Sequence, residues 1–279
     1  MTLTDQSTQV RPGEELDAAV IDPYLKANIP DLDGLPRISQ FPGGASNLTY
    51  LVSYPGRDFV LRRPPFGQKA KSAHDMGREF RILNQLNSGF PFCPKAYVHC
   101  TDSSLIGGEF YVMERVKGII LRSDIPAGLN LDASRTEALC KSFIDRLVEL
   151  HQVDYNACGL ADLGKPEGYV QRQIEGWTSR YKKALTPDAP RWEKVTTWLH
   201  EKMPADHPKP AIVHNDYRFD NVILDADNPM RIIGVLDWEM ATLGDPLMDL
   251  GNSLAYWIEA DDPAPVQLMR RQPSNAPGM

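Results

Sequence analysis

The spacing of apolar residues divides the chain into parts of different secondary structure. Between Arg37 and Met113 they form short runs broken by Gly, Pro and Asn residues, which is typical of β-strands. One stretch in this region, Ala73–Leu86, has apolar residues at helical spacing instead. The predicted strands are Arg37–Phe41, Leu48–Tyr54, Phe59–Arg62, Ala96–Cys100 and Glu109–Met113. This part is therefore predicted to be an antiparallel β-lobe with one helix.

After Gly118 the pattern becomes mainly helical. Apolar residues recur at helical spacing in Ser134–Val153, Glu167–Ala184 and Arg191–Met203, and Pro residues separate the last two segments. Helices after strands indicate an α+β fold with a second, mainly helical lobe.

The segment before the β-lobe is short and polar. Residues 1–13 are expected to be poorly ordered, and Glu14–Ala27 is predicted to be a short helix whose second half Pro23 weakens. We expect an N-terminal extension and two lobes, with boundaries at 1–34, 35–117 and 118–279.

Polar residues follow an apolar run at fixed intervals in the last third of the chain. Two β-type runs, Asn221–Leu224 and Arg231–Leu236, are separated by Asx and Pro residues, which predicts a hairpin. Because a hairpin reverses the chain, it returns Asp237 to the neighbourhood of Asp216 and Asn221. Three oxygen-bearing side chains are then expected at one point.

Phosphoryl transfer uses such a set of side chains. A carboxylate orients the attacking hydroxyl and accepts its proton, while amide and carboxylate oxygens hold Mg²⁺, which prefers hard oxygen ligands. We assign the catalytic role to Asp216, and metal binding to Asn221 and Asp237. His214 is expected to be structural, and Arg218 to neutralise phosphate or to hold the loop.

The order H-x-D-x-x-x-x-N, then a hairpin and an Asp, resembles the catalytic and metal-binding loops of the protein-kinase-like fold. The sequence HNDYRFDNVIL, followed by VLDWEMATLGDPLMDLG, resembles the aminoglycoside phosphotransferase family, whose relatives include choline kinases. It is most similar to the branch associated with acyl-CoA dehydrogenases. The resemblance runs from about Gly34 to Tyr256, and implies a two-lobe fold with a catalytic β-hairpin, with ATP and Mg²⁺ as cofactors.

The resemblance also implies which residues bind the nucleotide. The turn GGASN would cover the phosphates, an arginine would replace the usual lysine of the third strand and pair with a helix glutamate, and the crossing segment would bind the adenine base. These residues are Gly43, Gly44, Ser46, Asn47, Arg62, Glu79, Glu114 and Val116. Each has a simpler alternative, such as a glycine corner without a ligand, a strand-end charge or an exposed helix glutamate.

Other polar and aromatic residues receive weaker assignments. The resemblance makes Asp249 a brace for the catalytic loop, which could also be a helix N-cap. His151, His200 and His207 are expected to have no partners and to bind no metal. Trp177, Ser179 and Tyr181 could line an acceptor pocket or lie in a helix core, and Trp238, Tyr256 and Trp257 could form an aromatic cage for a choline-like acceptor.

Composition excludes several classes. The net charge of −7 gives no sign of nucleic-acid binding, and neither a signal peptide nor a membrane span is recognisable. The four cysteines include no CxxC pair, so we expect free thiols in the cytoplasm. After Trp257 the sequence is turn-rich, where family members continue with helices, so uncovered apolar surface is expected.

The leading hypothesis is therefore a kinase that phosphorylates a hydroxyl of a small molecule. The resemblance favours a hydroxyacyl-CoA-like metabolite over an aminoglycoside-like compound. The main alternative is a non-catalytic nucleotide-binding pseudokinase or partner module. A metal-dependent hydrolase built on His214 and Asp216 is weaker, because no second His lies at ligand spacing.

Overall fold

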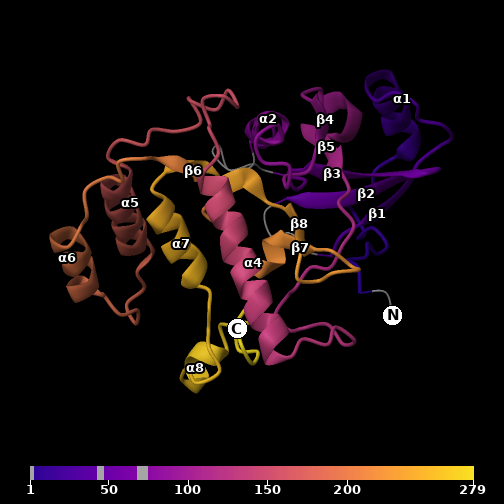
Figure 1. The fold of residues 1–279 in the computed structure, drawn as a ribbon. Coiled ribbons are helices and arrows are strands. Elements are labelled where there is room, and N and C mark those ends of the chain that lie inside the picture. Colours follow the sequence, from indigo (N-terminus) through magenta and orange to yellow (C-terminus); the bar gives the residue numbers. More distant parts are fainter. Residues whose placement is uncertain (1–2, 43–46, 68–74) are drawn as a thin grey trace.

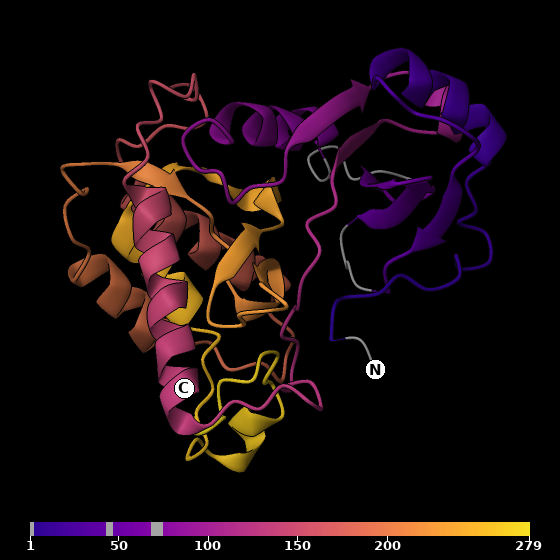
Figure 2. The ribbon, with the colours of Figure 1, turned by 45° about the vertical axis from the view of Figure 1, so that its right-hand side comes forward.

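The computed structural model describes residues 3–42, 47–67 and 75–279. Its elements form two lobes, a sheet with short helices and a larger helical part (Figure 1). The segment after the sheet's last strand in sequence crosses from one lobe to the other (Figure 2). Within the described residues, no helix combines the length and apolar character needed to cross a membrane.

The sheet of the first lobe has five antiparallel strands in the order β1-β2-β3-β5-β4. The strands are β1 Arg37–Gln40, β2 Leu48–Tyr54, β3 Arg57–Arg63, β4 Ala96–Cys100 and β5 Phe110–Glu114, and the helices α1 Ala18–Asn28, α2 Met76–Leu86 and α3 Ser103–Ile106. Successive side chains of a strand point to opposite faces. Phe110 and Val112 therefore belong to the hydrophobic cluster that includes residues of α1, while Tyr111 and Met113 belong to the hydrophobic cluster that includes residues of α2.

The second lobe surrounds two small antiparallel sheets, β6 with β9 and β7 with β8. Its helices are α4 Ala133–His151, α5 Tyr169–Ala184, α6 Glu193–Glu201, α7 Pro246–Leu254 and α8 Ala264–Gln267. Its strands are β6 Ala211–Val213, β7 Val222–Leu224, β8 Ile232–Val235 and β9 Thr242–Gly244, and its 3₁₀ turns η1 Phe219–Asn221 and η2 Trp238–Met240. The predicted hairpin is present as β7 and β8.

The crossing segment lies directly against this hairpin. The backbone groups of Ile119 and Leu224 exchange two hydrogen bonds of 2.8 Å. A Cβ atom on Gly118 would lie 2.3 Å from the Leu224 carbonyl oxygen, so only glycine fits this approach. The hairpin is thereby fixed beside the junction of the lobes.

The N-terminal prediction was partly wrong. The described part of the polar segment is ordered, because Thr8 pairs with Gln40 of β1 through backbone hydrogen bonds of 2.8 and 2.9 Å. Helix α1 continues through Pro23 and buries Ile21 and Leu25, whereas Val20 is 41% exposed. Burial against the sheet offsets the hydrogen bond that Pro23 cannot make. The boundaries of the three predicted segments remain a prediction.

Aromatic rings connect α4 to the segment before the hairpin. Phe143 of α4 is fully buried, and its ring centroid lies 4.3 Å from those of both Tyr217 and Phe219. The Tyr217 hydroxyl also donates to the Phe143 carbonyl oxygen at 3.0 Å. The longest helix of the second lobe thus supports the segment that contains Asp216.

We predict that Phe143→Ala lowers the free energy of unfolding by about 3–5 kcal/mol, because it leaves a cavity beside the rings of Tyr217 and Phe219. Val148→Ala on the same helix is the matched control, since Val148 is 45% exposed; its effect should stay within about 0.5 kcal/mol. Urea unfolding followed by tryptophan fluorescence measures both. Equal urea midpoints for Phe143→Ala and Val148→Ala would contradict the packing of Phe143 against Tyr217 and Phe219.

Candidate active site

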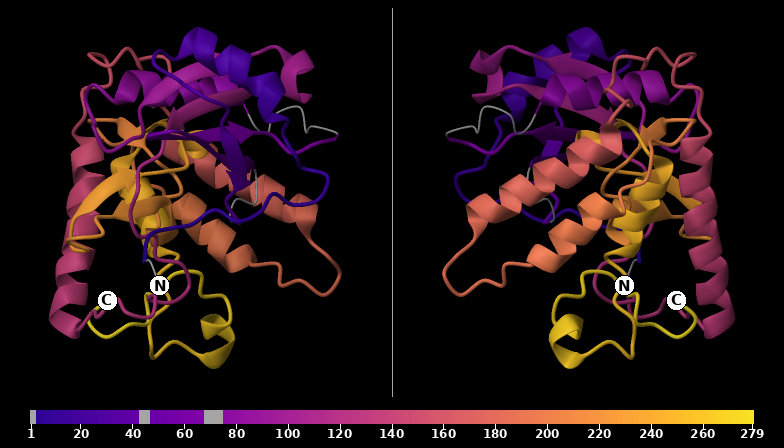
Figure 3. Two further views of the ribbon diagram at one scale, coloured as in Figure 1. Left: turned by 90° about the vertical axis from the view of Figure 1, so that its right-hand side faces the viewer. Right: turned by 90° about the vertical axis from the view of Figure 1, so that its left-hand side faces the viewer.

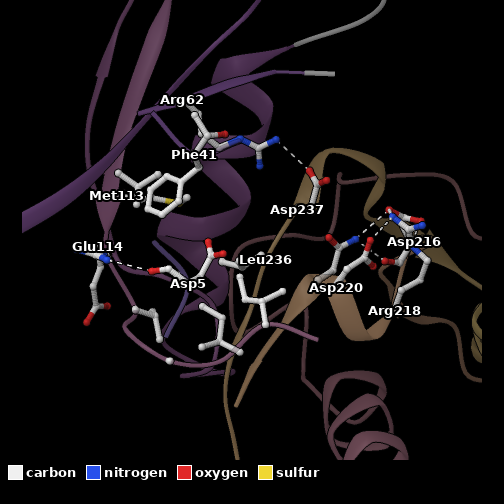
Figure 4. A pocket seen from close by; sticks show the side chains of 18 of the residues that line it. Asp5, Phe41, Arg62, Met113, Glu114, Asp216, Arg218, Asp220, Leu236 and Asp237 are labelled. Carbon is white, nitrogen blue, oxygen red and sulfur yellow. Dashed lines mark hydrogen bonds and ion pairs between the residues drawn. The ribbon is translucent and has the colours of Figure 1, made fainter. Parts of the chain in front are cut away.

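A cavity of about 430 Å³ lies between the two lobes. Residues of β3, β5 and the crossing segment form one wall, and the segments on either side of the β7–β8 hairpin form the other (Figure 4). Those that the sequence singled out are Arg62, Glu114, Val116, Asp216, Arg218, Asn221 and Asp237, and Glu239 lines the cavity beside them. The structure therefore brings the predicted catalytic residue, the predicted metal ligands and the residues of the crossing segment to one space.

His214 connects the two loops that flank the hairpin. Its ring is fully buried. The Nε2–H group donates to the Leu236 carbonyl oxygen at 2.9 Å, and Nδ1 accepts from the Asp216 backbone N–H at 3.3 Å. Both ring nitrogens are used within the protein, so His214 is structural and is not a metal ligand.

Asp249 holds the backbone of the loop before Asp216. This fully buried carboxylate accepts hydrogen bonds from the backbone N–H groups of His214 at 2.8 Å and Asn215 at 2.7 Å. His151 Nε2 lies 2.9 Å from the same carboxylate, so the expectation that His151 has no partner was wrong. The N-cap of α7 is Asp245, and Asp249 lies inside the helix.

Asp216 lies between an amide and a guanidinium. Asn221 Nδ2 donates to its Oδ2 at 2.9 Å, and Arg218 Nε lies 3.1 Å from its Oδ1. Burial raises the pKa of the Asp216 carboxyl, while the Arg218 charge opposes that rise. A raised pKa makes this carboxylate a better proton acceptor.

Arg62 connects the lobes through two carboxylates. Its Nη1 donates to Glu79 Oε1 at 2.6 Å, so the predicted pair is present, and its Nη2 donates to Asp237 Oδ1 at 3.0 Å. Burial raises the pKa of Glu79, and Arg62 opposes that rise. Asp237 has a φ of 66°, a left-handed conformation that Asp tolerates better than most residues. Such backbone strain is common at functional sites.

The oxygen atoms facing the cavity fit Mg²⁺. Asn221 Nδ2 is used by Asp216, which leaves the Asn221 amide oxygen as a ligand, and Asp237 is 32% exposed. The described residues include no cluster of three or more His, Cys, Asp or Glu that could hold a metal. Mg²⁺ would need few protein ligands here, because it usually completes its shell with phosphates and water.

The predicted phosphate-binding turn falls mostly on Gly43, Gly44 and Ser46, which lie outside the described residues. Asn47 is described and buried, and its Nδ2 donates to Glu239 Oε2 at 3.0 Å. Glu239 lies just after Asp237, so the end of the turn contacts the loop that carries the predicted metal ligand. Glu114 and Val116 line the cavity at the crossing segment, and their assignment to the adenine base remains a prediction.

Sequence reasoning missed three contributions to the site. Asp5 lines the cavity, although its polar segment was expected to be poorly ordered. Gln272 is 1% exposed, and its Oε1 accepts from the Phe219 backbone N–H at 3.0 Å, close to Asn221. Arg218 contacts a second carboxylate, since its Nη2 lies 3.3 Å from Asp220 Oδ2. The contacts of Asp5 and Gln272 join residues far apart in sequence, and no local pattern marks them.

A second cavity, of about 600 Å³, lies on the helical lobe. Helices α5 and α6 form an antiparallel pair there (Figure 3). Trp177 is 56% exposed and Tyr181 lines the cavity, so the alternative that these residues lie in a helix core was wrong. Trp192 and Trp198 are exposed to the same extent, 58% each, which agrees with the expected uncovered apolar surface.

Known proteins resemble the chain over most of its length. The model of the phosphotransferase enzyme family matches residues 37–278. The chain is 34% identical over 263 residues to acyl-CoA dehydrogenase family member 11 of Rattus norvegicus, covering 92% of this chain and 33% of that protein. It is 37% identical over 257 residues to member 10 of Mus musculus, covering 91% and 24%. Thiamine kinase of Escherichia coli is 26% identical over 235 residues, covering 81% and 67%.

The chain thus spans a third or less of the length of the two dehydrogenase relatives. Among solved structures, a candidate aminoglycoside phosphotransferase from Ralstonia eutropha is 33% identical with a TM-score of 0.74, covering 87% of this chain and 70% of that one. The ternary complex of APH(2″)-IIa with streptomycin and ATP is 21% identical with a TM-score of 0.56, covering 84% and 74%, which concerns the fold alone. The predicted protein-kinase-like α+β fold and the family resemblance are confirmed.

We predict that Asp249→Asn lowers the free energy of unfolding by about 3 kcal/mol, because an amide cannot accept from all the donors that this buried carboxylate satisfies. Asp227→Asn, at the exposed hairpin turn, is the control and should change stability by less than about 0.5 kcal/mol. Thermal and urea unfolding measure both. If Asp249→Asn left the free energy of unfolding unchanged, the loop would not depend on this carboxylate.

Proposed function

Because the chain belongs to the phosphotransferase enzyme family, we propose that it is an ATP- and Mg²⁺-dependent kinase that phosphorylates a hydroxyl group of a small molecule. The observation that carries this proposal is the convergence of Asp216, Asn221 and Asp237 on the cavity that Arg62 also lines. A non-catalytic binding module would have no use for a carboxylate with a raised pKa at this place.

Each side chain then has a distinct role. Asp216 orients the acceptor hydroxyl and takes its proton as the new oxygen–phosphorus bond forms and the bond to the leaving diphosphate breaks. Asn221 and Asp237 hold Mg²⁺, which neutralises phosphate charge when bound. Because the transition state of phosphoryl transfer is loose, positioning by Asp216 contributes at least as much as proton removal.

The cationic residues complete the site. Arg62 stays charged at any physiological pH and offers a planar fork of donors, which suits phosphate oxygens. Glu79 fixes one side of that fork at 2.6 Å and so directs the other side towards the cavity. Arg218 lies beside Asp216 at 3.1 Å, where it can neutralise the transferred phosphoryl group.

For the acceptor, we propose a hydroxyacyl-CoA-like metabolite first and an aminoglycoside-like compound second. The dehydrogenase names of the relatives support the first choice, and the name of the Ralstonia eutropha structure supports the second. A choline-like acceptor is not supported: Trp238 is 1% exposed, and the Tyr256 ring faces Arg218. We place the reaction in the cytoplasm, since all four cysteines are free thiols.

The decisive experiment measures ADP release with Mg-ATP across a panel of hydroxyacyl-CoA compounds, aminoglycosides and thiamine. We expect turnover with a member of the panel and a fall of about 10²–10⁴-fold in kcat for Asp216→Asn. Asp220→Asn is the matched control, because Asp220 also faces Arg218 but has no assigned role; it should retain activity within about tenfold of the parent protein.

Equal losses in the two variants would contradict the assignment of the base to Asp216. Tight Mg-ATP binding without transfer to any acceptor would favour the non-catalytic nucleotide-binding module instead. Absence of nucleotide binding would overturn both functions.

The pH dependence of kcat/KM tests the electrostatics of the site. Asp216 must be ionised to accept a proton, so activity falls as pH falls through its pKa. The Arg218 charge lowers the pKa of Asp216, so Arg218→Gln should raise that pKa and move the acid limb to higher pH. Arg231→Gln, a 66% exposed surface arginine, should leave the limb in place. An acid limb that moves to lower pH in Arg218→Gln would contradict this account.

A further inference from the structure

The N-terminal strap, defined as residues 3–14, runs from the sheet to the crossing segment. At the sheet, Ser7 Oγ lies 2.8 Å from Ser39 Oγ, and Thr8 exchanges backbone hydrogen bonds with Gln40. The buried Gln40 side chain also accepts from the Arg11 backbone N–H at 2.9 Å. The strap is therefore attached to β1 along several successive residues.

At its other end, the strap places Asp5 against the junction of the lobes. The Asp5 backbone N–H donates to the Gly118 carbonyl oxygen at 2.9 Å, and Arg115 Nη2 donates to the Asp5 carbonyl oxygen at 3.3 Å. Arg122 Nη2 donates to the Asp5 carboxylate Oδ1 at 3.0 Å. These contacts fix both the backbone and the side-chain direction of Asp5.

The Asp5 side chain faces the candidate active site. It lines the 430 Å³ cavity, is 24% exposed, and lies between Glu114 and Leu236 in the close view (Figure 4). Within the part of the chain that the structure describes, no donor contacts its second carboxylate oxygen, Oδ2. The Asp5 carboxylate is therefore held in a fixed direction, and its Oδ2 atom can accept a hydrogen bond from a ligand.

The position along the cavity decides which part of a nucleotide this acceptor meets. Phosphates belong at the cationic end with Arg62 and the metal ligands, and a carboxylate such as Asp5 would repel them. The base belongs at the crossing segment, at Glu114 and Val116. The sugar connects base and phosphates, and its hydroxyl groups are the donors that a carboxylate can bind.

We infer that Asp5 is a nucleotide-binding residue whose carboxylate accepts a hydrogen bond from a ribose hydroxyl. The inference rests on the proposed function. A site that hydrogen-bonds a substrate hydroxyl discriminates against the analogue that lacks it. Because the Asp5 side chain is partly solvated, the expected preference for a ribonucleotide is about tenfold rather than the much larger factors of buried sites.

The test measures dissociation constants by titration calorimetry for Mg²⁺ complexes of ATP, 2′-deoxy-ATP and 3′-deoxy-ATP. We expect the parent protein to bind at least one deoxy analogue about tenfold more weakly than ATP. Asp5→Ala should weaken ATP binding about tenfold and leave the binding of that analogue unchanged, so that the preference disappears. Asp5→Asn keeps the shape of the side chain, so it still tests the role of the carboxylate if Asp5→Ala fails to fold.

Ser7→Ala is the matched control, because it removes a contact of the strap with β1 but does not line the cavity; it should retain the sugar preference. Equal weakening of all three nucleotides by Asp5→Ala would assign Asp5 a purely structural role and overturn the inference. So would an unchanged preference in both Asp5 variants. Failure of the parent protein to bind any nucleotide would instead overturn the proposed function itself.

Discussion

The structure of the loop before Asp216 depends on one buried carboxylate. Asp249 is fully buried, and such a charge is tolerated only where hydrogen bonds and partners replace its hydration. It obtains them from the backbone of His214 and Asn215 and from His151. Since the His214 and Asn215 donors belong to the loop before Asp216, satisfying the carboxylate and positioning the predicted catalytic side chain are the same structural requirement.

A second requirement is that the lobes stay aligned, because residues of both line the cavity. Arg62 bridges Glu79 of the first lobe and Asp237 of the second, at 2.6 and 3.0 Å. Arg78 of α2 donates to the carbonyl oxygens of Glu239, at 3.1 Å, and of Ala241. The cross-lobe contacts thus reach the loop that carries the predicted metal ligand, and a relative shift of the lobes would displace Asp237.

Local patterns predicted much of this arrangement from the sequence. Strands β2 and β4 have the predicted bounds, because alternation and flanking turn residues are properties of the segments themselves. The convergence of Asp216, Asn221 and Asp237 could also be predicted, because the turn of the hairpin is recognisable in the sequence between its two β-type runs. The contacts of His151 with Asp249 and of Gln272 with Phe219 did not follow, because they join residues distant in sequence and leave no periodic signal. Asp5 was missed for the same reason.

The two cavities differ in how far local sequence patterns predict them. The proposed base and metal ligands lie within one stretch, Asp216–Asp237, where the covalent chain limits how far apart they can be. The walls of the apolar cavity come from α5 and α6, whose sequence has the same periodicity as a core helix. Helical periodicity shows which residues share a face but not what covers that face. Trp177 and Trp198 therefore resemble core residues in the sequence and are exposed in the structure.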